Sequence, residues 1–176
     1  MQRLDELQQL IRDSKQLSLD TELLDYAGVV SYHPEELVIT VKAGTPIKEM
    51  VQVLGQNNQG LSFYYEDENQ SIGAAYAQGG SDLSDAVLGV QIIDGRGDLL
   101  NFGGQVMKNV AGYDVARLLV GSQGRLALIT QISFKVMPQS YLGESKPLEH
   151  RAAESKLRTH LEQQLKAVFD PEDKFS

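Results

Sequence analysis

Cysteine and tryptophan are both absent from this chain of 176 residues, which contains only three histidines. Without Cys the chain has no disulfide, no thiolate metal ligand and no Cys nucleophile, which is compatible with a reducing compartment such as the cytoplasm, where we expect it. The three His, at 33, 150 and 160, are scattered and offer little basis for a metal site or a Ser-His-Asp triad. We therefore expect no bound metal and assign no catalytic residue.

Long hydrophobic runs are also missing. No segment approaches the roughly 18 apolar residues of a membrane span, so we expect none. The first residues are amphipathic and charged, without the apolar stretch of a secretory signal. The formal net charge of −8 repels phosphate backbones and argues against nucleic acid as a partner. A hydrophobic content of 41% is nevertheless typical of a globular protein.

The first half of the sequence predicts two helices and three strands. Apolar residues at helical spacing predict a helix over 2–13. Residues 28–32 and 37–42 are rich in β-branched side chains and predict antiparallel strands, separated by a turn at His33 to Glu36. Thr45 is the expected N-cap of a helix that has Pro46 in its first position and stops at Gly55. A further strand is predicted over 61–65, and 72–80 is predicted as a loop with a short helical turn.

The second half predicts a hairpin, a long strand and an end helix. Strands over 88–93 and 98–102 flank a turn with Gly95 and Gly97, and a strand over 125–136 is expected in the same sheet. A short helix is predicted over 114–120, a linker over 139–148 and a C-terminal helix within 149–176. The fold class is therefore α+β, with a mostly antiparallel sheet and flanking helices.

A glycine-rich polar segment between 101 and 124 carries the strongest functional signal. It contains five glycines, at 103, 104, 112, 121 and 124, each of which lets the backbone adopt positive φ or approach a neighbour closely. Taken by spacing alone, this pattern is more typical of tight turns around a small core than of a ligand site. Asp114 has the same two interpretations, because it suits a helix N-cap as well as a ligand contact.

The order of the motifs resembles a known family. Residues 106–114, with the sequence VMKNVAGYD, are followed by Leu118, Leu119 and then Gly121-Ser122-x-Gly124. This pattern resembles the glycolate oxidase FAD-binding subunit, which has a vanillyl-alcohol-oxidase or PCMH-type FAD-binding fold. Residues 28–46 and 87–97 also resemble that family, so the likeness covers roughly 22–138. It implies an FAD-binding-type domain over 1–138 that corresponds to the second lobe of the fold.

The resemblance also implies the cofactor, the reaction and the partners. FAD is the implied cofactor, and the implied function is an FAD-binding subunit of a glycolate-type 2-hydroxy-acid oxidoreductase. A second flavin subunit and an iron–sulfur subunit are the implied partners. The residues that match the family's cofactor contacts are Ser71, Ile72, Gly73, Ala74, Lys108, Asn109, Gly112, Tyr113, Gly121, Ser122, Gly124 and Ile129.

Several departures from the family pattern bear on the expected binding of FAD, among them the replacement of a small residue after Gly73 by Ala74. Residues 16–27 contain no glycine where the family has its pyrophosphate loop, and an acidic run, Glu66 to Glu68, replaces a Pro-Pro loop. Arg125 stands where Thr is common and could pair with a phosphate or with a carboxylate. Fewer backbone donors and more negative charge disfavour a pyrophosphate, so we expect this chain alone to bind FAD weakly or not at all. The alternative is a non-catalytic structural or regulatory subunit on a degenerate scaffold.

Overall fold

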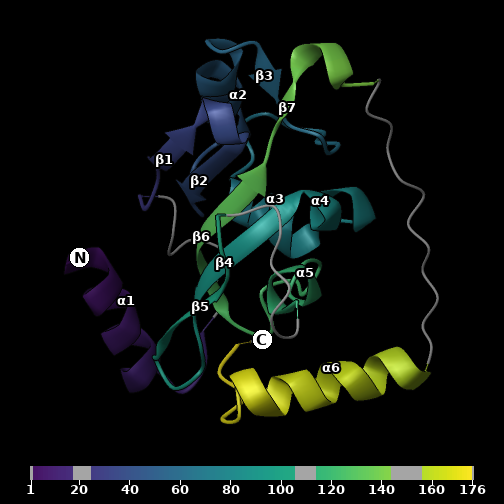
Figure 1. The fold of residues 1–176 in the computed structure, drawn as a ribbon. Helices are drawn as coiled ribbons and strands as arrows, with labels where there is room; N and C mark the ends of the chain where they lie inside the picture. The colour runs from purple at the N-terminus through teal and green to yellow at the C-terminus, as the bar shows by residue number, and fades with distance from the viewer. Residues whose placement is uncertain (1, 18–24, 106–113, 144–155, 176) are drawn as a thin grey trace.

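The computed structural model describes residues 2–17, 25–105, 114–143 and 156–175, and its architecture is α+β as predicted. Figure 1 shows a twisted sheet at the centre, with α1 on one side, several helices on the other, and α6 beneath them. The helices are α1 (Gln2–Asp13), α2 (Ile47–Gly55), α3 (Ile72–Gln78), α4 (Ser81–Ala86), α5 (Val115–Leu118) and α6 (Lys156–Phe169), with 3-10 turns η1 (Pro34–Glu36) and η2 (Gln139–Tyr141).

The main sheet has five antiparallel strands in the order β1-β2-β6-β4-β5. They are β1 (Val29–His33), β2 (Val38–Lys42), β4 (Val87–Ile93), β5 (Leu99–Gly103) and β6 (Leu128–Lys135). The predicted hairpin is confirmed, since β4 pairs with β5 in a register that sets Gly89 opposite Gly103. Its expected sheet partner is also confirmed, because β4 pairs with β6 on its other side.

One face of the sheet forms the main hydrophobic core. Alternate residues along a strand point to the same face, and Ile39, Val41, Ile92, Ile132 and Phe134 are all fully buried. They pack in one cluster with the apolar stripes of α2 and α3 and with the buried residues of α4 and α5. The helices that carry the candidate site are therefore held against this face of the sheet.

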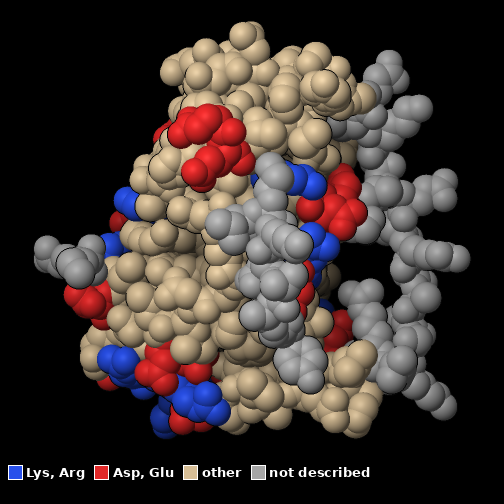
Figure 2. Space-filling model, in the orientation of Figure 1, with Lys and Arg blue, Asp and Glu red and all other residues tan. Residues whose placement is uncertain are grey.

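The opposite face is polar where α1 does not cover it. Thr40 and Ser133 share a hydrogen bond of 2.8 Å, Gln91 donates to Asn101 at 3.0 Å, and Gln131 donates to Gln91 at 3.1 Å. These neutral side chains come from β2, β4, β5 and β6 and connect neighbouring strands. Figure 2 shows acidic side chains grouped at the upper left, and mixed acidic and basic side chains at the lower left and along the right-hand side.

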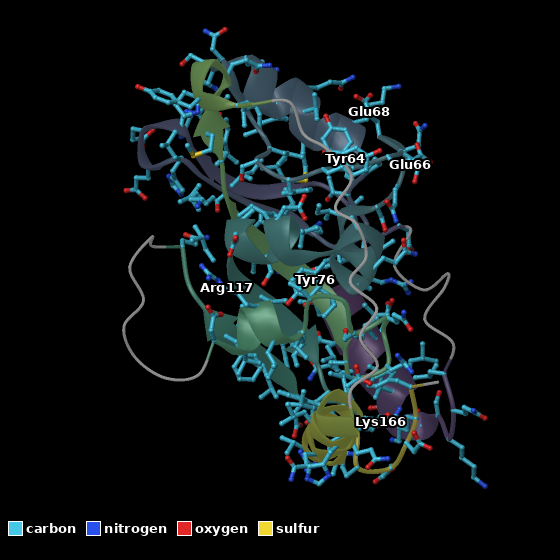
Figure 3. All side chains as sticks on the ribbon, turned by 90° about the vertical axis from the view of Figure 1, so that its right-hand side faces the viewer. Tyr64, Glu66, Glu68, Tyr76, Arg117 and Lys166 are labelled. Atoms are coloured by element: carbon cyan, nitrogen blue, oxygen red, sulfur yellow. The ribbon has the colours of Figure 1, made fainter. Side chains whose placement is uncertain are left out.

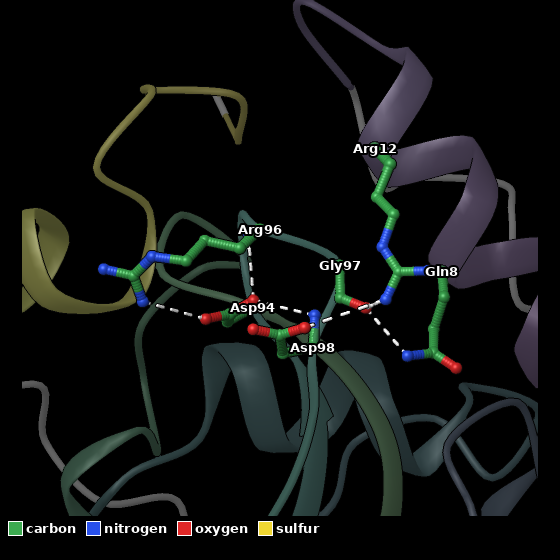
Figure 4. Close-up of polar contacts among 6 residues, drawn as sticks. All are labelled: Gln8, Arg12, Asp94, Arg96, Gly97 and Asp98. Atoms are coloured by element: carbon green, nitrogen blue, oxygen red, sulfur yellow. Dashed lines mark hydrogen bonds and ion pairs between the residues drawn. The ribbon is translucent and has the colours of Figure 1, made fainter.

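A second, smaller core joins α1 to the C-terminal segment. Leu7 and Ile11 of α1 pack with Ile93, Leu128 and Phe175, all of them buried. Next to this cluster, the β4–β5 turn is held by hydrogen bonds from α1 and by hydrogen bonds within the turn itself (Figure 4). Gln8 and Arg12 both donate to the carbonyl of Gly97, at 2.7 and 2.8 Å. Within the turn, the buried carboxylate of Asp94 accepts the backbone N–H groups of Arg96 and Asp98, both at 2.9 Å.

Two local predictions were wrong. Residues 61–65 are not a strand; instead β3 (Gln59–Gly60) pairs with β7 (Met137–Pro138), and buried Leu61 and Phe63 fill the core without strand pairing. Thr45 does not cap α2, whose N-cap is Pro46. The Thr45 hydroxyl instead bonds the backbone of Gly28 and Lys42, because that tertiary contact lies within its reach.

The region after residue 70 is more helical than predicted. Residues 72–78 form α3 instead of a loop with a short turn, because Ser71 caps the helix and the small residues that follow allow close packing. The helix expected within 149–176 is α6, which begins at Lys156 among the described residues. The division of the chain at 138 and 148 stays a prediction.

Candidate functional site

The predicted cofactor run, Ser71 to Ala74, forms the start of α3. The Ser71 hydroxyl accepts the backbone N–H of Ala74 at 3.2 Å, which is a regular N-cap. The N–H of Ile72 donates to the carbonyl of Thr45 and the N–H of Gly73 to the carbonyl of Ala43, both at 2.8 Å. Since these three donors already have partners within the chain, a ligand could engage them only by displacing an existing hydrogen bond.

Gly73 is a glycine for a packing reason. A Cβ built at this position would lie 2.9 Å from both the Cβ and the carbonyl oxygen of Ala43. Neither atom belongs to a flexible side chain, so α3 could not remain this close to the link between β2 and α2. Gly73 therefore allows the short distance between α3 and the link from β2 to α2, independently of any contact with a cofactor.

The second predicted segment is a turn with three residues at positive φ: Gly121 at +78°, Gln123 at +54° and Gly124 at +73°. It is tied to the end of α3, because Gly121 donates to the carbonyl of Tyr76 at 3.0 Å and Gln123 to that of Ala77 at 2.8 Å. The structure thus brings this turn to the C-terminal end of α3, whereas the predicted contacts Ser71 to Ala74 lie at the other end of that helix.

Tyr76 links α3 to α5 from within the core. Its side chain is fully buried, and its hydroxyl donates to the carbonyl of Ala116. Burial, and secondarily the nearby Asp114 carboxylate, raise the pKa of Tyr76 well above its usual value, so the phenol stays neutral. Asp114 itself accepts the N–H of Arg117 at 3.2 Å and caps α5, which confirms the N-cap interpretation. Figure 3 shows Tyr76 among these helices and Lys166 on α6 beneath them.

A hollow of about 870 Å³ opens between this turn and α6. That volume lies within the range of small-molecule sites, roughly 300–1,000 Å³. Its lining is mostly apolar. Leu118 and Leu126 line one side, and Leu161 and Leu165 of α6 line the other.

The polar groups of the hollow come from the turn and from the end of α6. Ser122 lies in its wall, and the Ser122 Oγ is buried without a hydrogen-bond partner among the described residues. Arg125 lies at the same wall with an exposed side chain whose Nη2 donates to Gln123 at 3.0 Å. Lys166 is already engaged by Asp170 at 3.2 Å and by Asp173 at 2.8 Å.

These residues fit a dinucleotide cofactor in part. Apolar walls suit a flat ring system, the Ser122 hydroxyl has hydrogen-bonding capacity to spare, and the Arg125 guanidinium suits an anionic group. The start of α3 fits less well, because its N–H groups are paired internally. Glu162 also lines the hollow and adds negative charge near it. The residues of the hollow thus suit the ring systems and one anionic group of a dinucleotide. They do not include a cluster of free backbone N–H groups that could bind its pyrophosphate.

Ile129, the predicted contact on strand β6, does not line this hollow. Ile129 is 5% exposed in the main core, so its side chain contacts other core residues. Lys108, Asn109, Gly112 and Tyr113 lie outside the described residues, as does most of the glycine-free span 16–27. Their roles toward a cofactor stay predictions.

Sequence reasoning missed the contribution of α6. The sequence predicts it only as a C-terminal helix, whereas in the structure Phe169 at its end packs into the main core and lies edge-on to Phe102, with ring centroids 5.9 Å apart. The apolar spacing of Leu161 and Leu165 did signal an amphipathic helix. That spacing alone could not indicate which surface the helix faces.

The described part of the chain contains neither a candidate metal site nor a candidate membrane span. No group of three or more His, Asp or Glu side chains there could hold a metal ion. Among the same residues, no helix is long and apolar enough to cross a membrane.

Two curated relatives are similar in sequence to this chain over part of their length. The Glycolate oxidase subunit GlcE of Escherichia coli (strain K12) is 43% identical over 124 residues, which cover 65% of this chain and 35% of that protein. The Glycolate oxidase subunit GlcD of Bacillus subtilis (strain 168) is 30% identical over 123 residues, covering 63% of this chain and 26% of that protein. The chain thus spans about a third or less of the length of these relatives.

A solved structure and a protein family also match part of this chain. An alkyldihydroxyacetonephosphate synthase structure matches 64% of this chain and 21% of its own, with a TM-score of 0.53 and 20% identity, a likeness that concerns the fold alone. The family described as FAD binding domain matches residues 8–103. Because that match spans more than half of the chain, this protein belongs to the FAD binding domain family.

Proposed function

We propose that this chain is the FAD-binding part of a subunit in a glycolate-type 2-hydroxy-acid oxidoreductase. The family match over 8–103 and the two glycolate oxidase subunits among the relatives support this function. The names of these relatives also favour an oxidoreductase over a non-catalytic scaffold. The structural observation that carries the proposal is the turn at 121–124, which is tied onto α3 and forms one wall of a hollow large enough for a cofactor.

The chain's own residues hold and orient the cofactor. When bound, FAD supplies the hydride chemistry, and the protein contributes position, orientation and electrostatics. Arg125 is placed to contact an anionic group, and the unpaired Ser122 hydroxyl becomes available to the cofactor when its side chain rotates toward the hollow. The leucines of the hollow exclude water from the rings of the cofactor. Gly121 and Gly124 let the backbone turn tightly enough to form this wall. No described side chain is assigned as an acid or base toward a substrate.

Assembly with other subunits belongs to the same proposal. The relatives are named as separate subunits, GlcE and GlcD, which supports a complex that contains two related flavin subunits. We place an iron–sulfur subunit in the same complex to carry electrons away from the flavin. A tagged copy of this chain, isolated from its native cells, should retain a larger flavoprotein with bound iron. Isolation of the chain alone, without flavin or iron, would argue against this assembly.

The first test is the affinity of the purified chain for FAD. We expect micromolar or weaker binding, because the start of α3 offers no free N–H groups and the surrounding charge is acidic. A titration that follows flavin fluorescence measures this affinity, and Ser122→Ala and Arg125→Ala should each weaken it further. Nanomolar affinity would mean that other residues replace the missing phosphate loop. No binding at millimolar FAD would contradict the proposed cofactor role of the isolated chain.

A further inference from the structure

We propose that α6 supplies the second wall of the cofactor hollow, so that Leu161 contacts an aromatic ring of FAD across from Leu118. This inference rests on the proposed function and assigns cofactor residues outside the family match, which ends at 103. In Figure 1, α6 lies directly beneath α5, the helix that carries Leu118. The turn at 121–124 and α6 both line the same hollow.

The position of α6 is fixed by its C-terminal end. Phe169 is buried in the main core, and its carbonyl accepts the N–H of Gly95 at 2.7 Å. The Lys166 Nζ donates to the carbonyl of Arg125 at 3.1 Å, directly beside the turn. These contacts hold one end of the helix against the sheet, and the preceding helical turns extend along the hollow. A preformed wall of this kind lowers the entropic cost of binding.

The exposed leucines of the two walls are otherwise unexplained. Leu118 is 50% exposed and Leu161 is 48% exposed, and both line the hollow. Large apolar side chains exposed around one concave site are typical of a ligand-binding surface. By contrast Val168, on the same helix, is 59% exposed but does not line the hollow. It therefore provides a matched control.

The charges around the hollow determine whether the phosphate or the apolar part of a ligand binds beside α6 or beside the turn at 121–124. Lys166 is neutralised by Asp170 and Asp173, so the end of α6 offers little net positive charge. Arg125 has no ion pair among the described residues and lies at the wall formed by the turn. Phosphate therefore belongs near Arg125, and the apolar part of the ligand belongs between the two leucine walls.

The test compares FAD affinity in the wild type, Leu161→Asp and Val168→Asp, measured by flavin fluorescence. Leu161→Asp replaces an apolar contact with a carboxylate that also repels phosphate, so its dissociation constant should rise about tenfold or more. Val168→Asp should stay within about twofold of wild type, since it adds the same charge to the same helix outside the hollow. Leu118→Asp, on the opposite wall, should reproduce the loss. Circular dichroism and thermal melts check that each variant is folded.

The outcomes separate this inference from the function on which it rests. If the wild type binds FAD and all three variants bind it equally well, the α6 wall is refuted while the cofactor role stands. If the wild type fails to bind FAD, both proposals fail. Competition by FMN or by ADP identifies the ring that occupies the hollow, and FAD binding that neither compound displaces would also overturn the inference.

Discussion

Replacing Gly73 with Ala tests whether this glycine serves packing. The added methyl group would lie 2.9 Å from the Cβ and the carbonyl oxygen of Ala43, closer than van der Waals contact allows. Because both atoms are held by the link between β2 and α2, relief requires α3 to move away from the sheet. The hydrogen bond from Gly73 N to Ala43 O, now 2.8 Å, would lengthen in the process.

The expected cost follows from the size of that clash. Overpacking a well-packed core typically costs about 1–3 kcal/mol. Ala is favoured over Gly inside a helix by up to about 1 kcal/mol, and the gain is smaller here because Gly73 lies in the first turn of α3. The net loss of unfolding free energy is therefore about 1–2 kcal/mol. For a domain of this size, each kcal/mol lowers the melting temperature by roughly 2–4 °C.

Thermal melts of Gly73→Ala and Gly55→Ala provide the assay and its control. Gly55 is the last residue of α2, and a Cβ there would have no atom within 4 Å. Gly55→Ala should therefore melt at or slightly above the wild-type temperature. If Gly73→Ala melts as high as Gly55→Ala, then α3 can shift at no cost, and the close approach does not explain this glycine.

Two further predictions concern buried polar groups. Tyr76→Phe removes the donor to a carbonyl of α5 and should lower the unfolding free energy at pH 8 by about 1–3 kcal/mol. Because burial and Asp114 raise the pKa of Tyr76 in the folded state, its stabilisation is complete below the ordinary value of 10.0 and is lost as pH rises above it. Denaturant melts from pH 8 to 11 should thus show a shallower decline for Tyr76→Phe, and parallel curves would contradict the assignment. Asp170→Asn should cost up to about 3 kcal/mol, because it removes the charge that pairs with Lys166 and accepts two backbone N–H groups. Asp173→Asn, at an 82% exposed partner of the same lysine, should cost less than about 1 kcal/mol, and equal losses would refute this ranking.

The sheet could be predicted from the sequence because its signals are local. The β4–β5 hairpin has apolar runs on both sides of a glycine turn, and that pattern leaves few alternatives. The same holds for α1, whose apolar spacing matches its bounds. The Asp114 cap was likewise one of two stated interpretations of a residue type that favours helix starts.

The predictions that were wrong depend on contacts that are distant in sequence. Thr45 has the residue type of a helix cap, but the backbone of Gly28 lies within reach and takes its hydroxyl instead. Residues 61–65 have the alternating pattern of a strand, yet no neighbouring strand pairs with them. The hollow is a similar case, because one wall comes from the turn at 121–124 and the other from α6. Local periodicity predicts each wall separately and cannot place one opposite the other.

The second hydrophobic core has a consequence for the order of folding during synthesis. Leu7 and Ile11 are translated long before Phe175, which completes their cluster and follows Ile11 by 164 residues (175 minus 11). Contacts over such a separation form late, because a long loop must close before they contribute. The apolar stripe of α1 therefore stays incompletely covered until Phe175 has emerged from the ribosome, and until then it offers an apolar surface to chaperones or to premature association.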